Sequence, residues 1–247
     1  MNRILQNMPP VVKNLLILNV ILWLAMSFVP VIDSRLMQWC ALHYFTSPAF
    51  NVAQLVTYMF LHGGFMHLFF NMFALVMFGG IIERSMGSKR FLFYYLSCGI
   101  FAALVQMGAY AVALSHYTSM FTPEQLHEII DQGWRHLSQG YQYSDPTLAK
   151  INALVNGPMV GASGAIYGVI LAFGMLFPNQ PIYLFFIPVP IKAKWMVLGY
   201  GILELTYGLG SATDNIAHFA HLGGMIAGVF LILYWKKKGV FNNHWFF

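Results

Sequence analysis

Charged residues are scarce in this chain. Of its 247 residues, 9% are Asp, Glu, Lys or Arg and 58% are hydrophobic, and the mean hydropathy is +0.63. A soluble domain carries about 25% charged residues. The composition therefore excludes a soluble globular protein and indicates an integral membrane protein.

Cysteine is also scarce, because Cys40 and Cys98 are the only two. Cys40 lies in the connection after the first hydrophobic segment and Cys98 within the third, so the expected topology keeps them apart. The sequence therefore predicts no disulfide framework. No small-residue cleavage site follows the first hydrophobic segment, so we expect it to persist as a helix and not as a removable signal peptide.

The hydropathy pattern predicts an all-α membrane protein with six transmembrane helices in one domain over residues 1–247. A spanning helix needs ~20 apolar residues. The second, fourth and fifth segments are shorter, which favours a thinned bilayer or shielding by neighbouring helices. The six segments cover residues 11–30, 67–83, 91–114, 160–177, 193–209 and 216–235.

The positive charges follow this expected topology. With the N-terminus inside, ten of the thirteen Lys and Arg residues fall on the inner side, and only Arg35, Arg135 and Lys150 fall outside. The positive-inside rule then places both termini in the cytoplasm. We expect a multi-pass protein of a bacterial inner (plasma) membrane. The net charge of +5 gives no reason to expect a nucleic-acid partner.

Two connections are longer than a simple turn. Residues 31–61 are rich in aromatics and poor in charge, so we expect a first loop embedded in the outer leaflet. Residues 115–157 form an amphipathic extracytoplasmic insert between the third and fourth segments. Its expected helices begin at a capping box, Thr122–Gln125, and at Asp145-Pro146. We expect these helices to lie on the outer membrane surface, and we assign them no chemistry.

The second segment begins with polar residues. His67 and Asn71 are four apart and share one helix face. Polar groups inside a membrane helix indicate function by default, although hydrogen bonds between helices are the structural alternative. His62 and His67, five apart, lie on different faces without a carboxylate or cysteine, so the pattern predicts no metal site.

A serine lies at the mouth of the fourth segment, in the run Gly161–Gly168. Ser163 occupies the first helical turn, where unpaired N–H groups and the helix dipole suit a developing oxyanion. The alternative is that Gly164 and Gly168 only form a helix-packing face.

The sixth segment carries His221 and a stripe of small residues, each four apart: Ala220, Gly224 and Gly228. The second, fourth and sixth segments all run from outside to inside. Their polar residues therefore lie within roughly 10 Å of the outer helix ends. The glycine faces allow the fourth and sixth helices to touch, which makes a hydrogen bond between Ser163 and His221 feasible.

These residues predict a Ser–His dyad. Ser163 is the nucleophile and His221 its general base. No aspartate lies at this depth to complete a triad. His67 and Asn71, with the Ser163 backbone N–H, are the expected oxyanion donors, and Tyr167 can stack on the histidine ring.

Two further polar residues keep open roles. Glu204 lies near the outer end of the fifth segment. It can belong to a proton path, but a hydrogen-bonded or water-facing glutamate is the simpler interpretation. His218, one turn before His221, is expected to face the water-accessible end.

In this combination the sequence resembles the rhomboid intramembrane serine proteases. The motifs that carry the resemblance are Gly161–Gly164 with Tyr167, Ala217–Gly224, and His62 with His67 and Asn71. The resemblance implies a rhomboid bundle with Ser163 as nucleophile, His221 as base and His67, Asn71 and Ser163 at the oxyanion hole, with Tyr167 and Gly161 in support. The Trp-Arg pair common in the family's first loop is absent, which leaves gating and substrate choice open.

The resemblance further implies a serine endopeptidase that cleaves transmembrane segments through an acyl-enzyme, with membrane lipids around it and without cofactor or metal. One alternative is a catalytically silent rhomboid-like chaperone, which would function without Ser163. Another is a small transporter with a His/Glu relay. A transporter should show an internal repeat, and we find none.

Overall fold

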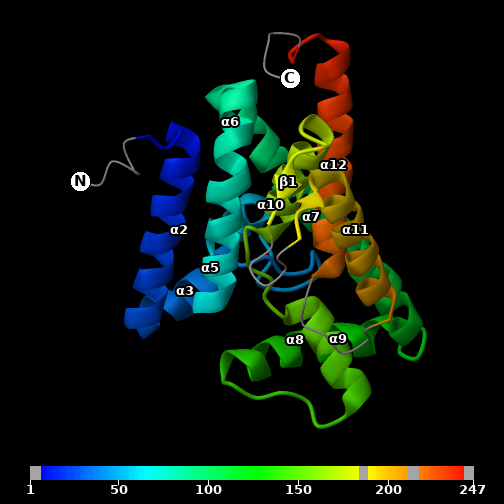
Figure 1. Cartoon of the computed structure of the whole chain (residues 1–247). Helices are drawn as coiled ribbons and strands as arrows, with labels where there is room; N and C mark the ends of the chain where they lie inside the picture. The colour runs from blue at the N-terminus through cyan, green and yellow to red at the C-terminus, as the bar shows by residue number, and fades with distance from the viewer. Residues whose placement is uncertain (1–6, 184–188, 211–216, 242–247) are drawn as a thin grey trace.

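The computed structural model describes residues 7–183, 189–210 and 217–241, and within these ranges the chain is almost entirely helical (Figure 1). The elements in chain order are α2 (Pro10–Phe28), α3 (Pro30–Cys40), α4 (Gln54–Thr57), η1 (Tyr58–Phe60), α5 (Phe65–Ala74), η2 (Leu75–Gly79), α6 (Gly80–Met86), α7 (Ser88–Thr118), α8 (Pro123–Ser138), α9 (Pro146–Asn156), α10 (Ser163–Leu176), β1 (Pro181–Ile182), β2 (Ile191–Lys192), α11 (Ala193–Gly210) and α12 (His218–Lys237).

Four helical stretches are long and apolar enough to cross a membrane. They are Pro10–Phe28, Phe65–Met86, Ser88–Thr118 and His218–Lys237. The second combines α5, η2 and α6 through a π-helical turn and reaches 22 residues, so it is longer than the hydropathy pattern predicts. It ends at Gly87, whose φ of 82° is a backbone conformation that glycine adopts readily at the end of a helix.

The outward faces of these helices carry large apolar side chains. Phe28 is 77% exposed, Phe93 57% and Phe230 67%. Exposed apolar surface of this extent is unfavourable in water and favourable against lipid hydrocarbon. The described part of the chain is therefore an all-α membrane fold.

Helix α10 lies in the middle of the bundle, and nearly all of its side chains are buried. It begins at Ser163 and has 14 residues, fewer than the segment predicted at 160–177. Its neighbour α12 approaches so closely that a Cβ added to Gly224 would lie 1.8 Å from the Gly164 carbonyl oxygen. The predicted contact between the two glycine faces is confirmed.

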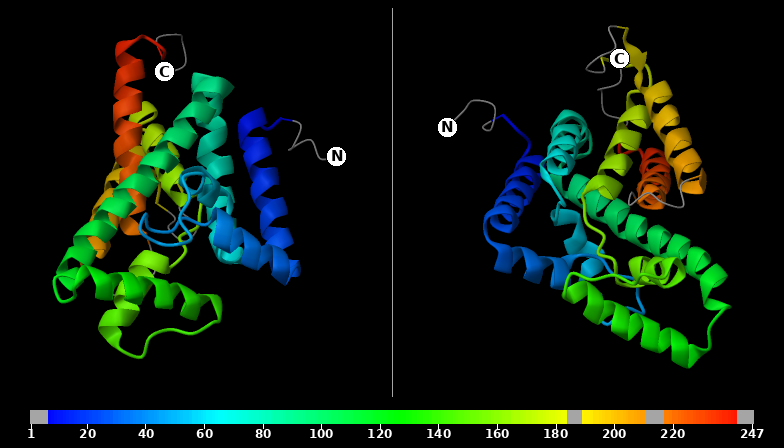
Figure 2. Two further views of the ribbon diagram at one scale, coloured as in Figure 1. Left: turned by 180° about the vertical axis from the view of Figure 1, so that it is seen from behind. Right: turned by 90° about the horizontal axis from the view of Figure 1, so that it is seen from below.

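Helix α7 supports α10 and α12 from behind. In the rear view of Figure 2 it runs diagonally across the bundle and reaches α8 and α9. The Tyr94 hydroxyl donates a 2.7 Å hydrogen bond to the Gly168 carbonyl, and the Gln106 amide oxygen accepts one of 3.0 Å from Ala220 N–H. These bonds fix the start of α12 and the middle of α10 on one scaffold.

The first loop has two unequal parts. Helix α3 has no buried residue, and Trp39 is 64% exposed. The part that follows instead packs inside the protein, where Leu42 pairs with Met159 and Tyr58 donates a 2.8 Å bond to the Gly99 carbonyl. The second part of the loop therefore packs against the helical bundle.

The insert folds as expected at its caps. Thr122 and Gln125 form the capping box, and Asp145 accepts bonds from the N–H groups of Thr147 and Leu148. Its apolar stripe does not behave as expected, because Leu126, Ile129 and Ile130 pack against the hydrophobic core of the protein.

Asn156 ties the insert to the first loop. Its side chain accepts a 2.7 Å bond from the Ser47 hydroxyl and donates to the Ile130 carbonyl (2.8 Å) and to Asn152 Oδ1 (2.9 Å). The side of α8 that was expected to meet lipid therefore covers protein.

Candidate active site

The site is built around a contact between the starts of α10 and α12. The Ser163 hydroxyl oxygen lies 2.7 Å from His221 Nε2, across 58 residues of sequence. No side chain caps the N-terminus of α10 among the described residues. Its first N–H groups therefore remain available beside the hydroxyl, which is the arrangement an oxyanion needs.

Tyr167 fixes the histidine ring. The two rings are stacked at a centroid separation of 4.2 Å and an interplanar angle of 5°. Tyr167 lies one turn after Ser163 on the same helix, so α10 holds both the hydroxyl and the surface against which the base rests. The predicted stacking is confirmed.

His67 reaches the same place from α5. A Cβ added to Gly161 would lie 2.7 Å from His67 Nε2 and 3.7 Å from Ser163 Oγ. The His67 ring and the Ser163 hydroxyl therefore both lie next to the Gly161 backbone. Gly161 adopts φ of 132°, where side-chain-bearing residues are rare, and its N–H donates to the Tyr58 carbonyl at 3.0 Å. Glycine therefore lets His67 approach the serine.

Asn71 lies one turn after His67 and is 6% exposed. Its amide nitrogen Nδ2 is buried and has no hydrogen-bond partner among the described residues. A buried donor without an acceptor is costly, and such groups require an explanation. An acceptor that arrives with a substrate supplies one.

His62 supports His67 from the loop before α5. The two rings meet edge to face at 5.0 Å, and His62 is 2% exposed. Burial, and to a lesser extent the proximity of His67, lowers the pKa of His62 to about 3. The ring is therefore neutral at physiological pH and acts as a packing partner of His67.

The sequence interpretation missed the environment of Glu204. Its carboxylate oxygen Oε2 lies 3.0 Å from His221 Nδ1 and 2.6 Å from His218 Nδ1, and Oε1 accepts a hydrogen bond from the Tyr167 hydroxyl. The sequence prediction considered only an aspartate as a third member of the site and left the role of this glutamate open. Its polar character in a membrane helix was the available signal.

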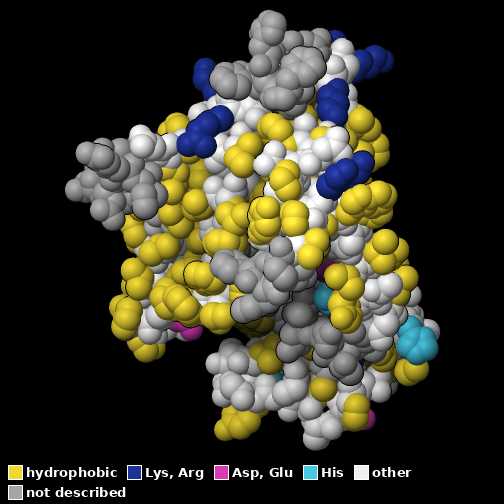
Figure 3. Space-filling model, in the orientation of Figure 1, with side chains coloured by type: hydrophobic (Ala, Val, Ile, Leu, Met, Phe, Trp, Pro, Cys, Tyr) yellow, Lys and Arg dark blue, Asp and Glu magenta, His cyan; other side chains and the backbone are white. Residues whose placement is uncertain are grey.

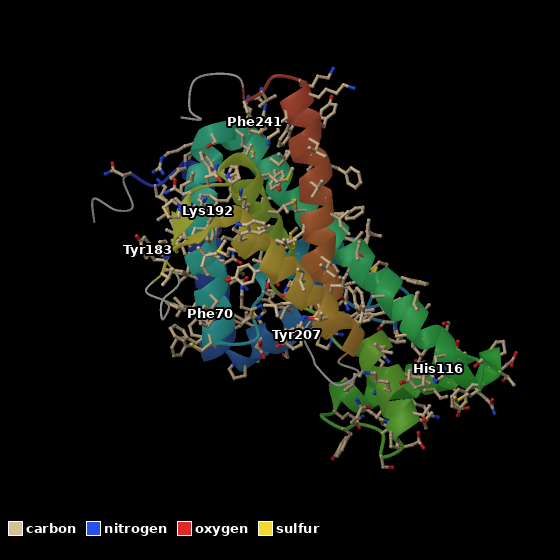
Figure 4. All side chains as sticks on the ribbon, turned by 45° about the vertical axis from the view of Figure 1, so that its right-hand side comes forward. Phe70, His116, Tyr183, Lys192, Tyr207 and Phe241 are labelled. Carbon is tan, nitrogen blue, oxygen red and sulfur yellow. The ribbon has the colours of Figure 1, made fainter. Side chains whose placement is uncertain are left out.

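His218 is also placed differently from the expectation. It is 8% exposed, and its ring stacks on Tyr207 with centroids 5.7 Å apart, so it does not face the water-accessible end. Figure 4 shows Tyr207 on α11 and Phe70 on α5, both in the half of the bundle nearer to α8 and α9.

Glu204, His218 and His221 are also a possible set of metal ligands, since one donor atom from each lies within 4.8 Å of the others. Donors around a tetrahedral zinc ion lie roughly 3.3 Å apart, given metal–ligand distances near 2.0–2.1 Å. The 2.6 Å between Glu204 and His218 is a hydrogen-bond length. In the arrangement described here, Glu204 and His218 are therefore joined by a hydrogen bond.

Comparison with known proteins finds one matching domain family and several proteins with similar sequences. A Rhomboid domain model matches residues 49–238. Rhomboid protein 1, mitochondrial, of Saccharomyces cerevisiae is 30% identical over 178 residues, which are 72% of this chain and 40% of that protein. Rhomboid protease GluP of Bacillus subtilis is 28% identical over 193 residues, 77% of this chain and 28% of that protein.

The presenilin-associated rhomboid-like protein, mitochondrial, of Homo sapiens is 25% identical over 217 residues, 85% of this chain and 47% of that protein. The chain thus spans less than half the length of each of these relatives. Because the domain model covers most of the residues that form the bundle and the site, the chain belongs to the rhomboid family.

Proposed function

We propose that this chain is an intramembrane serine endopeptidase that cleaves transmembrane segments of membrane proteins. The observation that carries the proposal is the 2.7 Å contact between Ser163 Oγ and His221 Nε2. A serine hydroxyl is a weak nucleophile at neutral pH and requires an adjacent base. The family includes a protein named as a protease, which supports the assignment.

The reaction proceeds through an acyl-enzyme. Ser163 Oγ attacks the carbonyl carbon of the scissile peptide bond while its proton moves to His221 Nε2. His221 then gives this proton to the leaving nitrogen as the C–N bond breaks, which leaves an ester on Ser163. A water molecule then attacks the ester carbon while its proton moves to His221. His221 returns this proton to Ser163 Oγ as the ester C–O bond breaks, which releases the second product as a carboxylic acid and restores the serine.

The negative charge on the carbonyl oxygen has three candidate donors: the Ser163 backbone N–H, Asn71 Nδ2 and His67. The free N–H groups at the start of α10 and the unpartnered Asn71 amide support this role. Fixed donors at the place where charge develops contribute more than donors that must reorient.

The proposed topology has six membrane crossings. They are the four longer spans, the buried helix α10 and the helix α11, which exposes large apolar side chains on its outer side. The start of α2 and the end of α12 lie at the end of the molecule opposite α8 and α9 (Figure 1). Lys and Arg side chains gather at that same end in Figure 3. By the positive-inside rule this end is cytoplasmic and the insert extracytoplasmic. Arg3 lies outside the described residues.

The substrates are other membrane proteins, because the hydroxyl lies within the bundle at the mouth of α10. The surrounding partners are lipids, in keeping with the exposed apolar faces. We propose a bacterial inner membrane as the location. The family resemblance favours a single-span substrate with small residues at the cleaved bond and helix-destabilising residues beyond it.

Reconstitution in lipid vesicles tests the function. Single-span reporter proteins with small residues at different depths should be cut by the wild type inside the span and left intact by Ser163→Ala. Equal cleavage by both proteins would show that another group or a contaminant does the chemistry. A folded wild type that cuts none of the reporters would favour the alternative function, a rhomboid-like chaperone of membrane proteins that does not cleave them.

A further inference from the structure

The carboxylate of Glu204 is held by the same groups that surround the proposed base. Glu204 is 8% exposed and lies on α11. Three groups from α10 and α12 converge on it: the Tyr167 hydroxyl and His218 Nδ1 (2.6 Å) make hydrogen bonds to Oε1 and Oε2, and His221 Nδ1 lies 3.0 Å from Oε2. A buried carboxylate requires partners of this kind.

We propose that Glu204 is a positioning residue for His221, so that the proposed Ser163–His221 pair works with a carboxylate behind its base. This inference rests on the proposed function. The carboxylate selects the tautomer of His221, sets the angle of its ring and stabilises the imidazolium that forms when Ser163 loses its proton.

The tautomer argument follows from the two nitrogens of the ring. His221 Nε2 faces Ser163 Oγ and must be free of hydrogen to accept its proton. In the neutral ring the hydrogen then belongs on Nδ1, which points toward Glu204 Oε2 at 3.0 Å. An acceptor on that side favours this tautomer over the one with hydrogen on Nε2.

The charge argument concerns the intermediate. After proton transfer His221 carries hydrogens on both nitrogens and a positive charge, and Glu204 supplies the opposite charge at contact distance. Only the proton on Nε2 moves on to the leaving nitrogen; the proton on Nδ1 stays, and the carboxylate is never protonated. The 3.0 Å contact is not aligned as a hydrogen bond, and His221 Nδ1 has no aligned partner within the described ranges. Contacts of catalytic groups often align only with substrate bound.

The helix packing is arranged so that Glu204 can reach His221. Gly201, Glu204 and Gly208 share one face of α11. A Cβ added to Gly208 would lie 3.2 Å from the Phe219 ring and 3.3 Å from His218 Cβ, and one added to Gly201 would lie 3.5 Å from Met225. The small residues on either side of Glu204 bring α11 against α12 at this level.

Tyr167 has two separable contacts in this arrangement. Its ring stacks on His221 and its hydroxyl donates to Glu204. Tyr167→Phe therefore keeps the stack and removes one of the bonds that hold the carboxylate, which gives a variant milder than any change of Glu204 itself.

The alternative is that Glu204 only joins α11 to α12. Glu83 offers a matched control for that role, because it is 2% exposed and its carboxylate accepts bonds from Val11 N–H (3.0 Å), Val12 N–H (2.8 Å) and the Ser88 hydroxyl (2.7 Å). Glu83→Gln and Glu204→Gln are thus the same substitution at two buried carboxylates that each contact three groups, and only Glu204 contacts the proposed base.

The experiment measures the rate constant for labelling by a fluorophosphonate between pH 5 and 9, together with the melting temperature. The titratable groups that face His221 are His67 from α5, Tyr167 from α10, Glu204 from α11 and His218 from α12. All except Glu204 are unchanged in Glu204→Gln, so a change in the profile reports the lost carboxylate.

Glu204→Gln should be labelled at least about tenfold more slowly than the wild type, because the base loses the group that orients it. The acid limb of its profile should move to lower pH by about one unit or more, because a charge near an imidazole at contact distance shifts protonation by that amount. Tyr167→Phe should move both quantities in the same direction by less. Glu83→Gln should lower the melting temperature and leave the profile in place.

Labelling of Glu204→Gln within about twofold of the wild type, on an unshifted profile, would overturn the proposal. If Glu204→Gln does not fold, Tyr167→Phe decides, and a wild-type rate and profile in that variant would overturn it equally. A folded wild type without labelling, or labelling of Ser163→Ala, would instead refute the proposed function, and the inference would fall with it.

Discussion

At the scale of single residues, two buried asparagine side chains, Asn71 and Asn156, differ in whether their amide groups have hydrogen-bond partners. Asn71 Nδ2 has no partner in the described part of the chain, whereas each polar atom of the Asn156 side chain is bonded. Asn71→Ala should therefore cost little stability and lower the labelling rate by about 10²–10³-fold, the usual effect of losing an oxyanion donor.

Asn156→Ala is the matched comparison. It should lower the free energy of unfolding by about 1–3 kcal/mol, because it leaves buried partners unsatisfied, and it should leave the labelling rate of the folded fraction near that of the wild type. Thermal unfolding and labelling of both variants check the pair. An Asn71→Ala protein that loses stability but keeps its labelling rate would assign Asn71 to structure.

Gly161 supports a second prediction at this scale. Gly161→Ala places a methyl group 2.7 Å from the His67 ring at a φ of 132°. The strain alone should cost roughly 1–3 kcal/mol, and displacement of His67 should slow labelling. Gly108→Ala, which meets nothing within 4 Å, is the control for a glycine change in the same protein. Similar effects from both variants would contradict the proposed role of Gly161.

At the scale of helices, the distance between α10 and α12 sets the Ser163–His221 contact. Gly224→Ala would place a methyl group 1.8 Å from the Gly164 carbonyl oxygen, so the helices must separate. We expect a destabilisation of about 1–3 kcal/mol, as for other overpacked sites, and loss of most labelling. Gly199→Ala, with nothing within 4 Å of the added Cβ, should keep both properties. Retained labelling in Gly224→Ala would show that the bundle tolerates separation.

Helix starts and glycine faces were predictable from the sequence because they are local. The capping box at Thr122 and the stop at Gly87 depend on residues a few positions away. The pairing of Ser163 with His221 was also predictable, since both lie near the outer ends of helices that run in the same direction and carry small residues.

Glu204 was not predictable in this way, because its contacts depend on how far α11 slides along α12, and that is fixed by packing at Gly201 and Gly208. The side of α8 that faces the protein was unpredictable for a related reason. A stripe with helical periodicity looks the same whether it covers lipid or protein, and only the bonds of Asn156 decide between them.

At the scale of the whole molecule, the charge distribution predicts orientation in the membrane. His116 and the insert lie at one end in Figure 4, and Lys192 lies toward the other. In a Cys40→Ser background, Gln139→Cys should react with a membrane-impermeant maleimide in intact cells. Lys238→Cys should react only after permeabilisation. Both positions are exposed, so the reverse pattern would contradict the proposed topology.

The central claim is that Ser163 is an activated nucleophile whose base is His221, and active-site labelling tests it most directly. A fluorophosphonate should label the wild type and neither Ser163→Ala nor His221→Ala, with all three proteins folded in lipid vesicles. Labelling that persists in Ser163→Ala would place the reactive group elsewhere, and a folded wild type that never reacts would contradict the account.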